Sequence, residues 1–279
     1  MDIQLSAQQQ AVVGCNEPRI VVKACPGSGK TFSVAARMAK LLRENNLSRH
    51  RGIAAISFTN TACEVIQKEL KETFGCRNIG YPSFIGTIDS FINTYIFLPY
   101  AHLVMGCDCR PEIVGTAFNK WFDYDPTQTR YIRGKHGERI ITSRDTNYYF
   151  DLISFGLNDQ LLRLAPYQSY HFGKADWDYP NKKDGSPKKI ISELKEMKWK
   201  HFNAGKFNQA DAIYFTFRIL DKYPSITQNL VRRFPILIID EAQDTTELQM
   251  AIIDKLSQYG AESIMLIGDP DQAIFEWNT

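Results

Sequence analysis

Short aliphatic runs alternate along the chain with longer stretches in which apolar residues recur every three to four positions. The aliphatic runs predict buried strands, and the periodic stretches predict amphipathic helices. The expected strands lie within 19–23, 51–60, 81–92, 234–241 and 263–269. The expected helices are 5–13, 32–42, 61–73, 210–221 and 246–257. This alternation indicates βαβ units, and hence an α/β fold with a parallel sheet and helices on both of its faces.

The alternation stops between about residues 96 and 209, where aromatic and charged residues mix and helical periodicity is patchy. We therefore expect a mainly helical subdomain, 96–209, inserted into a domain formed by 1–95 and 210–279. A lysine-rich loop at 181–189 lies near the end of the insertion. Such a loop is either solvated surface or a contact for a nucleic-acid backbone.

The composition is that of a globular protein, with 44% hydrophobic and 23% charged residues among 279. The net charge of +2 gives a weak overall field, so any nucleic-acid contact must come from local clusters of lysine and arginine. The six cysteines form no CxxC pair and fit reduced thiols better than a zinc site. We expect a cytoplasmic protein without a membrane contact, because no signal peptide or long apolar run is recognisable.

A glycine-rich turn separates the first expected strand from the helix at 32–42. Strand, glycine-rich turn and helix are the context of a phosphate-binding loop, in which backbone N–H groups and a helix N-terminus converge on phosphates. In such a loop Lys30 adds a positive charge and the Thr31 hydroxyl reaches Mg²⁺. Ala24 stands where the usual pattern has its first glycine. The residues predicted to bind the nucleotide here are Ala24, Cys25, Pro26, Gly27, Ser28, Gly29, Lys30 and Thr31.

Two later strands end in polar residues that suit phosphoryl transfer. Asp240, at the end of a buried strand, is placed to hold Mg²⁺, and Glu241 to orient the attacking water. The alternative is that both carboxylates cap the following helix. Gln272 follows the last strand and is predicted to hydrogen-bond the γ-phosphate or its water, unless it is an ordinary loop amide.

Ser6 is the expected N-cap of the glutamine-rich helix upstream of the phosphate loop, and Gln9 lies in that helix. One interpretation is a polar helix face. The other is recognition of adenine, because a glutamine amide presents a donor beside an acceptor, as the N6 and N7 atoms of adenine require.

Six ordered segments resemble the motifs of the UvrD/PcrA/Rep group of superfamily 1 DNA helicases. They are 5–9, 24–31, 57–62, 86–91, 240–244 and 268–277. The resemblance implies a RecA-like P-loop NTPase motor that uses ATP and Mg²⁺, moves 3′→5′ on single-stranded DNA and opens tailed duplexes. It also implies DNA contacts by Phe58, Thr59, Asn60, Thr87, Asp89 and Trp277. An aromatic platform such as Trp277 suits a motor that must ignore sequence, because every base has a π-face.

The sequence departs from the family pattern at three positions. Phe32 replaces an arginine near the adenine, so the base is expected to be held differently or more weakly. Asp89 replaces a histidine, a variant similar to the helicase-like subunit of Gabija-type anti-phage systems. Asn278 replaces an arginine after the last motif.

The resemblance covers only the first motor domain, domain 1A with a 1B insertion. The second motor domain, which supplies arginines to the γ-phosphate, would follow residue 279 or come from a partner subunit, and a nuclease is one conceivable further partner. We expect weak ATP binding and slow hydrolysis from this piece alone. Two other functions compete with a helicase: a degenerate motor half that senses nucleic acid or binds a partner, and a small-molecule kinase. The kinase fits poorly because it explains neither 58–60 nor 268–277.

Overall fold

The computed structural model describes residues 4–25, 27–44, 47–76, 79–106, 109–114, 132–133, 139–141, 153–159, 161–163, 195, 198–269 and 271. The chain divides into two compact units. The first unit consists of Met1–Ile96 and Leu220–Thr279, and the second is Phe97–Ile219. The assignment of these parts as motor domain and insertion stays a prediction.

The first unit is built on a parallel sheet of five strands in the order β1-β11-β10-β2-β3. The strands are β1 (Arg19–Lys23), β2 (Ile53–Ser57), β3 (Phe84–Thr87), β10 (Ile236–Ile239) and β11 (Ser263–Gly268). All four pairings are parallel, which confirms the predicted α/β fold. The carboxyl ends of all five strands therefore meet at one edge of the sheet, where ligands bind in folds of this class.

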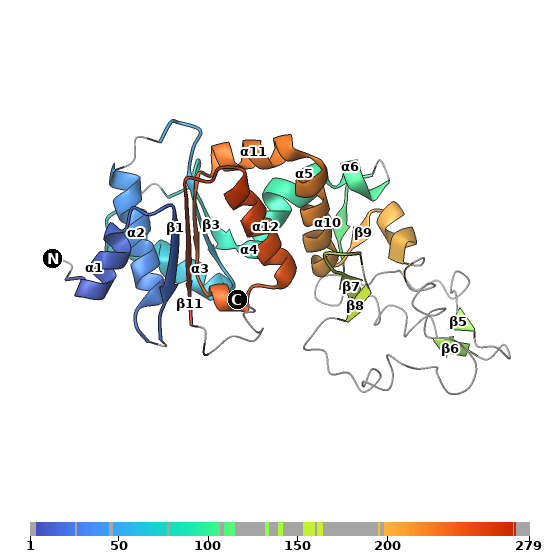
Figure 1. Cartoon of the computed structure of the whole chain (residues 1–279), viewed down its shortest axis with the longest axis horizontal. Coiled ribbons are helices and arrows are strands. Elements are labelled where there is room, and N and C mark those ends of the chain that lie inside the picture. The colour runs from blue at the N-terminus through green and yellow to red at the C-terminus, as the bar shows by residue number, and fades with distance from the viewer. Residues whose placement is uncertain are drawn as a thin grey trace. The chain divides into compact units, whose positions relative to one another are not determined.

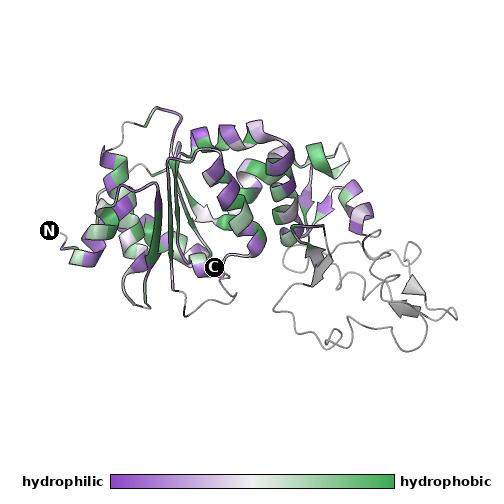
Figure 2. Cartoon of the chain, viewed as in Figure 1, coloured by the Kyte–Doolittle hydropathy of each residue, from purple (hydrophilic) through white to green (hydrophobic). Residues whose placement is uncertain are grey.

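Helices cover both faces of this sheet (Figure 1). On one side lie α1 (Ala7–Gly14), α2 (Lys30–Glu44) and α3 (Asn60–Glu72), and on the other α4 (Ile88–Ile92), α11 (Pro224–Arg233) and α12 (Glu247–Gln258). Val34 and Met38 of α2 and Ile66 of α3 join Ile238 and Met265 of the sheet in one buried core. Every residue of β2 and β10 is buried, as the aliphatic runs predicted, and strands of the sheet are coloured as hydrophobic in Figure 2.

Side-chain caps fix the starts of several helices. The predicted N-cap, Ser6, accepts a hydrogen bond from the Gln9 amide, and the Gln9 side chain accepts one from the Ser6 amide. Thr246 and Gln249 form the same capping box at α12. Each such cap satisfies N–H groups that the helix itself leaves without partners.

The second unit combines helices with short strands. The chain enters it through a π-helix, η1 (Asn93–Phe97), followed by α5 (Leu98–Tyr100) and α6 (His102–Met105), and leaves it within α10 (Gln209–Lys222). Residues 198–203 are also helical. Its strands pair as β4 (Glu112–Ile113) with β9 (Lys206–Phe207), β5 (Ile132–Arg133) with β6 (Arg139–Ile141), and β7 (Ile153–Phe155) with β8 (Leu161–Arg163). The sequence did not predict these strands.

Packed rings form the core of the second unit. Phe155, Phe202, Phe207 and Phe215 are buried, and the rings of Phe202 and Phe207 stack at 5.1 Å. Within the described part of the chain, no helix has both the length and the apolar character that crossing a membrane requires.

Candidate functional site

The predicted phosphate loop begins directly after β1. The Ala24 amide donates to the Gly268 carbonyl at the end of β11, over 3.0 Å, and the Ser28 amide donates to the Cys25 carbonyl, over 3.2 Å. Gly27 and Gly29 have φ angles of +73° and +78°, a left-handed conformation that residues with a Cβ adopt only under strain. These glycines let the chain turn sharply from β1 into α2. Pro26 lies outside the described residues.

Helix α2 starts at Lys30, so its first-turn amides lie at the carboxyl edge of the sheet. The Ser33 amide donates to the Gly29 carbonyl, the first bond of the helix. The amides before it have no partner within the helix, and together with the helix dipole they favour an anion. This geometry suits a phosphate group.

Two contacts join the start of α2 to the end of β10. Lys30 Nζ lies 3.1 Å from Glu241 Oε2, and Thr31 Oγ1 donates to Asp240 Oδ2 over 3.0 Å. The two partners of each contact are more than two hundred residues apart in sequence. They are adjacent in space because β1 and β10 both flank β11. The structure thus brings together four of the predicted site residues.

Burial shifts the acid-base balance of this cluster. Asp240 is 1% exposed, and burial together with the charge of Glu241 raises its pKa to about 6. The hydrogen bonds from Thr31 and from the Glu241 amide, and the charge of Lys30, act in the opposite direction. The pKa of Asp244 is raised by the same two causes. The carboxylates crowd one another, so a cation beside Asp240 would favour their charged forms.

Thr31 and Asp240 also fit the protein ligands of Mg²⁺. A hydroxyl and a buried carboxylate are oxygen donors, and magnesium in nucleotide sites takes few protein ligands beside water and phosphate. Within the described residues, no group of three or more His, Cys, Asp and Glu side chains is placed to hold a metal ion by itself. A site completed by the nucleotide's own phosphates is consistent with this donor set.

Gln243 braces the acidic strand end in a way that the sequence did not predict. Its Nε2 donates to Glu241 Oε2 over 2.7 Å, and its Oε1 accepts from the Asp269 amide over 3.1 Å. It lies in a 3₁₀ turn, η2 (Ala242–Asp244), which Glu241 enters with a φ of +53°. A Cβ on Gly268 would come within 2.5 Å of Gln243 Oε1, so a larger residue there would push the Gln243 side chain out of place. The carboxylates do not cap the next helix, because Thr246 does.

Gln9 lies beside the loop, and Phe32 packs against the core. The space left by the missing side chain of Gly29 is occupied by Gln9, whose Nε2 would be 2.9 Å from a Cβ there. Oε1 of Gln9 accepts from the Ser6 amide. The ring of Phe32 contacts that of Phe74, with centroids 5.5 Å apart.

The described residues predicted to contact DNA lie at or just after the ends of β2 and β3, at the same edge of the sheet. Phe58 and Asn60 are exposed. Thr59 and Thr87 are the N-caps of α3 and α4, accepting from the amides of residues 62 and 90. Asp89 accepts a long bond, 3.5 Å, from Gln249. The two threonine hydroxyls therefore also fix where these helices begin.

Several predictions fall on residues that the structure does not describe. Gln272, Trp277, Asn278 and the loop 181–189 all lie outside the described ranges. Their predicted roles stay predictions.

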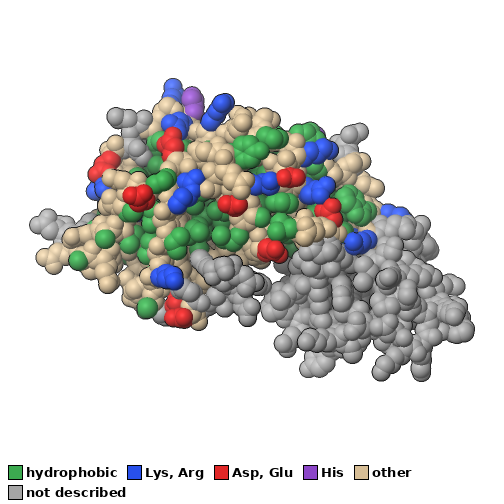
Figure 3. Space-filling model, viewed as in Figure 1, with side chains coloured by type: hydrophobic (Ala, Val, Ile, Leu, Met, Phe, Trp, Pro, Cys, Tyr) green, Lys and Arg blue, Asp and Glu red, His purple; other side chains and the backbone are tan. Residues whose placement is uncertain are grey.

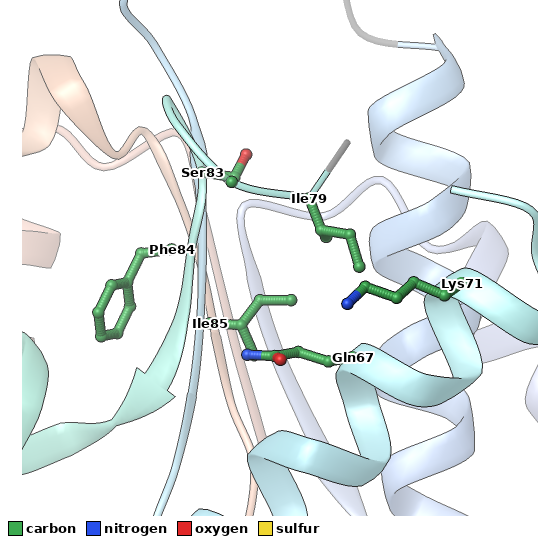
Figure 4. A pocket seen from close by; sticks show the side chains of 7 residues that line it. Gln67, Lys71, Ile79, Ser83, Phe84 and Ile85 are labelled. Carbon is green, nitrogen blue, oxygen red and sulfur yellow. The ribbon is translucent and has the colours of Figure 1, made fainter. Parts of the chain in front are cut away.

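A separate pocket of about 370 Å³ lies between α3 and β3. Gln67 and Lys71 project into it from α3 toward Ile85, while Phe84 points to the opposite side of the strand (Figure 4). Its lining residues do not include the phosphate loop. On the face shown in Figure 3, acidic and basic side chains of the described residues are interspersed rather than separated by sign.

The sequence model of one protein family, the UvrD/REP helicase N-terminal domain, matches residues 5–279 of the chain. The chain belongs to this helicase family. The relatives of this chain include the ATP-dependent DNA helicase PcrA of Bacillus subtilis. The two sequences are 24% identical over 278 residues, which are 98% of this chain and 34% of that protein. DNA helicase II of Escherichia coli is 25% identical over 276 residues, 98% of this chain and 34% of that protein.

DNA helicase II of Haemophilus influenzae is 26% identical over 274 residues, 92% of this chain and 32% of that protein. The chain thus spans about a third of the length of the curated relatives that it matches. The described part of this helicase-family domain carries its glycine-rich loop and its acidic strand end on neighbouring parts of one sheet edge.

Proposed function

We propose that the chain is the first motor domain of an ATP-dependent DNA helicase. The observation that carries the proposal is the pairing of Lys30 with Glu241 and of Thr31 with Asp240 across the carboxyl edge of the sheet. These are the side chains that ATP hydrolysis requires, one cation, one hydroxyl and two carboxylates, within hydrogen-bond distance of one another. In this proposal the loop 24–31 is the Walker A motif, and Asp240 with Glu241 is the Walker B motif.

Each residue has a distinct role in the proposed reaction. Thr31 and Asp240 are the residues that would hold Mg²⁺, which would supply neutralisation of the phosphate charge. Lys30 leaves Glu241 for the phosphates, which frees Glu241 to orient and deprotonate the attacking water. Gln243 keeps the Glu241 carboxylate in place, since it donates to that carboxylate and is itself fixed to β11. Gln272 is proposed to sense the γ-phosphate.

DNA is proposed to bind along the same sheet edge, and movement is proposed to be 3′→5′. Phe58 is 37% exposed directly after β2, so its ring is available to a base. Asn60, Thr59, Thr87 and Asp89 follow the ends of β2 and β3, and Trp277 is the proposed stacking platform. Such contacts are independent of base sequence, as a motor needs.

A second motor domain is the proposed partner, in the same polypeptide or in another subunit. It would supply the arginines that stabilise the transferred phosphoryl group, without which such reactions slow by roughly 10³–10⁵-fold. The chain alone should therefore bind ATP and hydrolyse it slowly.

The competing candidate, a degenerate motor half that only senses nucleic acid or binds a partner, is disfavoured by the assembled cluster at Lys30 and Asp240. The similarity to Gabija-type subunits rests on Asp89 alone.

Strand displacement tests the proposal. The chain joined to its second motor domain should unwind duplexes with a 3′ tail and not those with a 5′ tail, and Lys30→Ala should abolish unwinding. Lys23→Ala, which removes an exposed lysine from the end of β1, is the matched control and should unwind normally. Unwinding from a 5′ tail, or undiminished unwinding by Lys30→Ala, would contradict the assignment.

A further inference from the structure

Arg37 is a buried cation on α2 whose hydrogen bonds go to the end of α1. It is 3% exposed, and its Nη1 donates to the carbonyl oxygens of Val12 and Cys15 over 2.9 and 2.7 Å. The Val13 oxygen lies 3.5 Å from the same nitrogen. All three carbonyls belong to the end of α1 or to the residue after it.

Helix α1 depends on such an anchor. It has eight residues, none of them buried, and helices this short are not stable in isolation. Its last carbonyls have no partner within the helix, and a positive charge at a helix C-terminus is favourable. The partly buried residues Leu5, Val12 and Val13 add apolar contacts with the core. Arg37 thus ties α1 to α2 by charge-assisted hydrogen bonds.

The other end of α1 carries Gln9. The capping box with Ser6 fixes which amide atom points where, because Oε1 accepts from the Ser6 amide. The Gln9 Nε2 atom therefore points toward Gly29, and among the described residues it donates to none. The last two residues of the phosphate loop, Lys30 and Thr31, open helix α2, and Arg37 lies on the same helix about two turns beyond Lys30. The position of Gln9 relative to the loop is therefore set through α1 and Arg37.

An amide held in this orientation distinguishes purines. Adenine offers the N6 donor beside the N7 acceptor, which match the glutamine oxygen and nitrogen. Guanine offers acceptors at both O6 and N7, so a glutamine that cannot flip places its oxygen against another oxygen.

We propose that Arg37 is a positioning residue for base selection, which holds Gln9 against the phosphate loop so that the site prefers ATP to GTP. This inference rests on the proposed function, since it needs a nucleotide on the loop. In this proposal Arg37 acts through α1, to whose last carbonyl oxygens its Nη1 donates.

The test compares the binding of fluorescent ATP and GTP analogues to the chain and its variants. The wild type should prefer ATP, and Arg37→Met should weaken ATP binding on the order of tenfold while GTP binding changes little. Binding of inorganic tripolyphosphate, which has no base, should be unchanged. The matched control is Arg19→Met, because Arg19 also donates to carbonyls, those of Pro18, Ala261 and Ser257, but not to those of α1. It should keep the ATP preference.

A double-mutant comparison separates positioning from general damage. Gln9→Ala should abolish the ATP preference, and Arg37→Met added to it should cause no further loss of preference. If Arg37→Met does not fold, Arg37→Lys keeps the charge without the planar fork. That variant should show a smaller preference and faster hydrogen exchange in α1 than in the sheet.

The outcomes distinguish the two proposals. A wild type that binds no nucleotide would overturn the proposed function and this inference with it. A wild type that prefers ATP, combined with an Arg37→Met or Arg37→Lys variant that keeps the full preference, would overturn the positioning role alone. Additive losses from Gln9→Ala and Arg37→Met would also overturn it.

Discussion

Each of the two units contains a lysine–carboxylate pair, and the two pairs differ in how far their side chains are exposed. In the second unit Lys198 and Asp211 are 2.7 Å apart with side chains that are 0% exposed. In the first unit Lys30 and Glu241 are 3.1 Å apart, and their side chains are 9% and 28% exposed. A fully buried pair cannot separate without leaving a charge in an apolar core, whereas a pair at an open sheet edge can exchange partners with a ligand.

The surroundings reinforce the difference. Asp211 also accepts hydrogen bonds from Ser154 and from the Asn208 amide, which complete its shell. Glu241 instead has a left-handed φ, a conformation that strains the backbone of a residue with a Cβ. Its carboxylate accepts a hydrogen bond from Gln243. The buried pair is therefore a structural device, and the open pair is suited to chemistry.

The largest expected effect comes from breaking the buried pair. Lys198→Met leaves the Asp211 carboxylate without its cation, and burial already raises the pKa of that group. The free energy of unfolding should fall by about 3–5 kcal/mol, measured by urea denaturation. Adding Asp211→Asn should recover part of the loss, because it removes the uncompensated charge. A loss below about 1 kcal/mol in the single variant would contradict the comparison.

The next effect is a pH dependence of the second unit. Burial and the charges of Lys206 and Lys198 lower the pKa of His201 from 6.5 to about 4. The unfolded chain then binds more protons than the folded chain between those values, so stability is complete above about pH 6.5 and falls as the pH drops toward 4. His201 should contribute a loss of about 2–3 kcal/mol between pH 7 and pH 4.5. Denaturation curves of His201→Leu should lack this component, and identical pH profiles would refute it.

A smaller loss of stability is expected when Gln243, which holds Glu241 in place, is crowded by a larger residue at 268. In Gly268→Ala the new Cβ would meet Gln243 Oε1 at 2.5 Å and the Gln243 amide at 3.1 Å, so the Gln243 side chain must leave its bonds to Glu241 and Asp269. Overpacking of this kind costs about 1–3 kcal/mol, and ATP binding should weaken as well. Gly14→Ala is the control, because nothing lies within 4 Å of its added Cβ. Equal stability of the two variants would argue against the brace.

The smallest effect on stability should come from breaking the open pair itself. Lys30→Met should change the free energy of unfolding by less than about 1 kcal/mol, because Glu241 is 28% exposed and solvent screens a pair that it reaches. A melting experiment on this variant beside Lys198→Met measures the contrast directly. Similar losses in the two variants would mean that the open pair is structural too.

The sequence predicted most of the first unit and less of the second. Apolar runs located all five strands, and Ser6 was predicted to cap α1. The convergence of the loop with Asp240 follows from parallel strands sharing one edge. The roles of Gln243 and Arg37 could not be predicted, because their partners are fixed by tertiary packing and a local pattern carries no such information. The short strands between 97 and 219 are two or three residues long, too few to show a period.

Calorimetric titration with Mg²⁺ and ATP shows whether Lys30, Thr31, Asp240 and Glu241 form an ATP site. We expect saturable binding by the wild-type chain and by Lys23→Ala, and loss of binding in Lys30→Ala without loss of folding. Equal ATP binding by the wild type and Lys30→Ala would contradict this assignment.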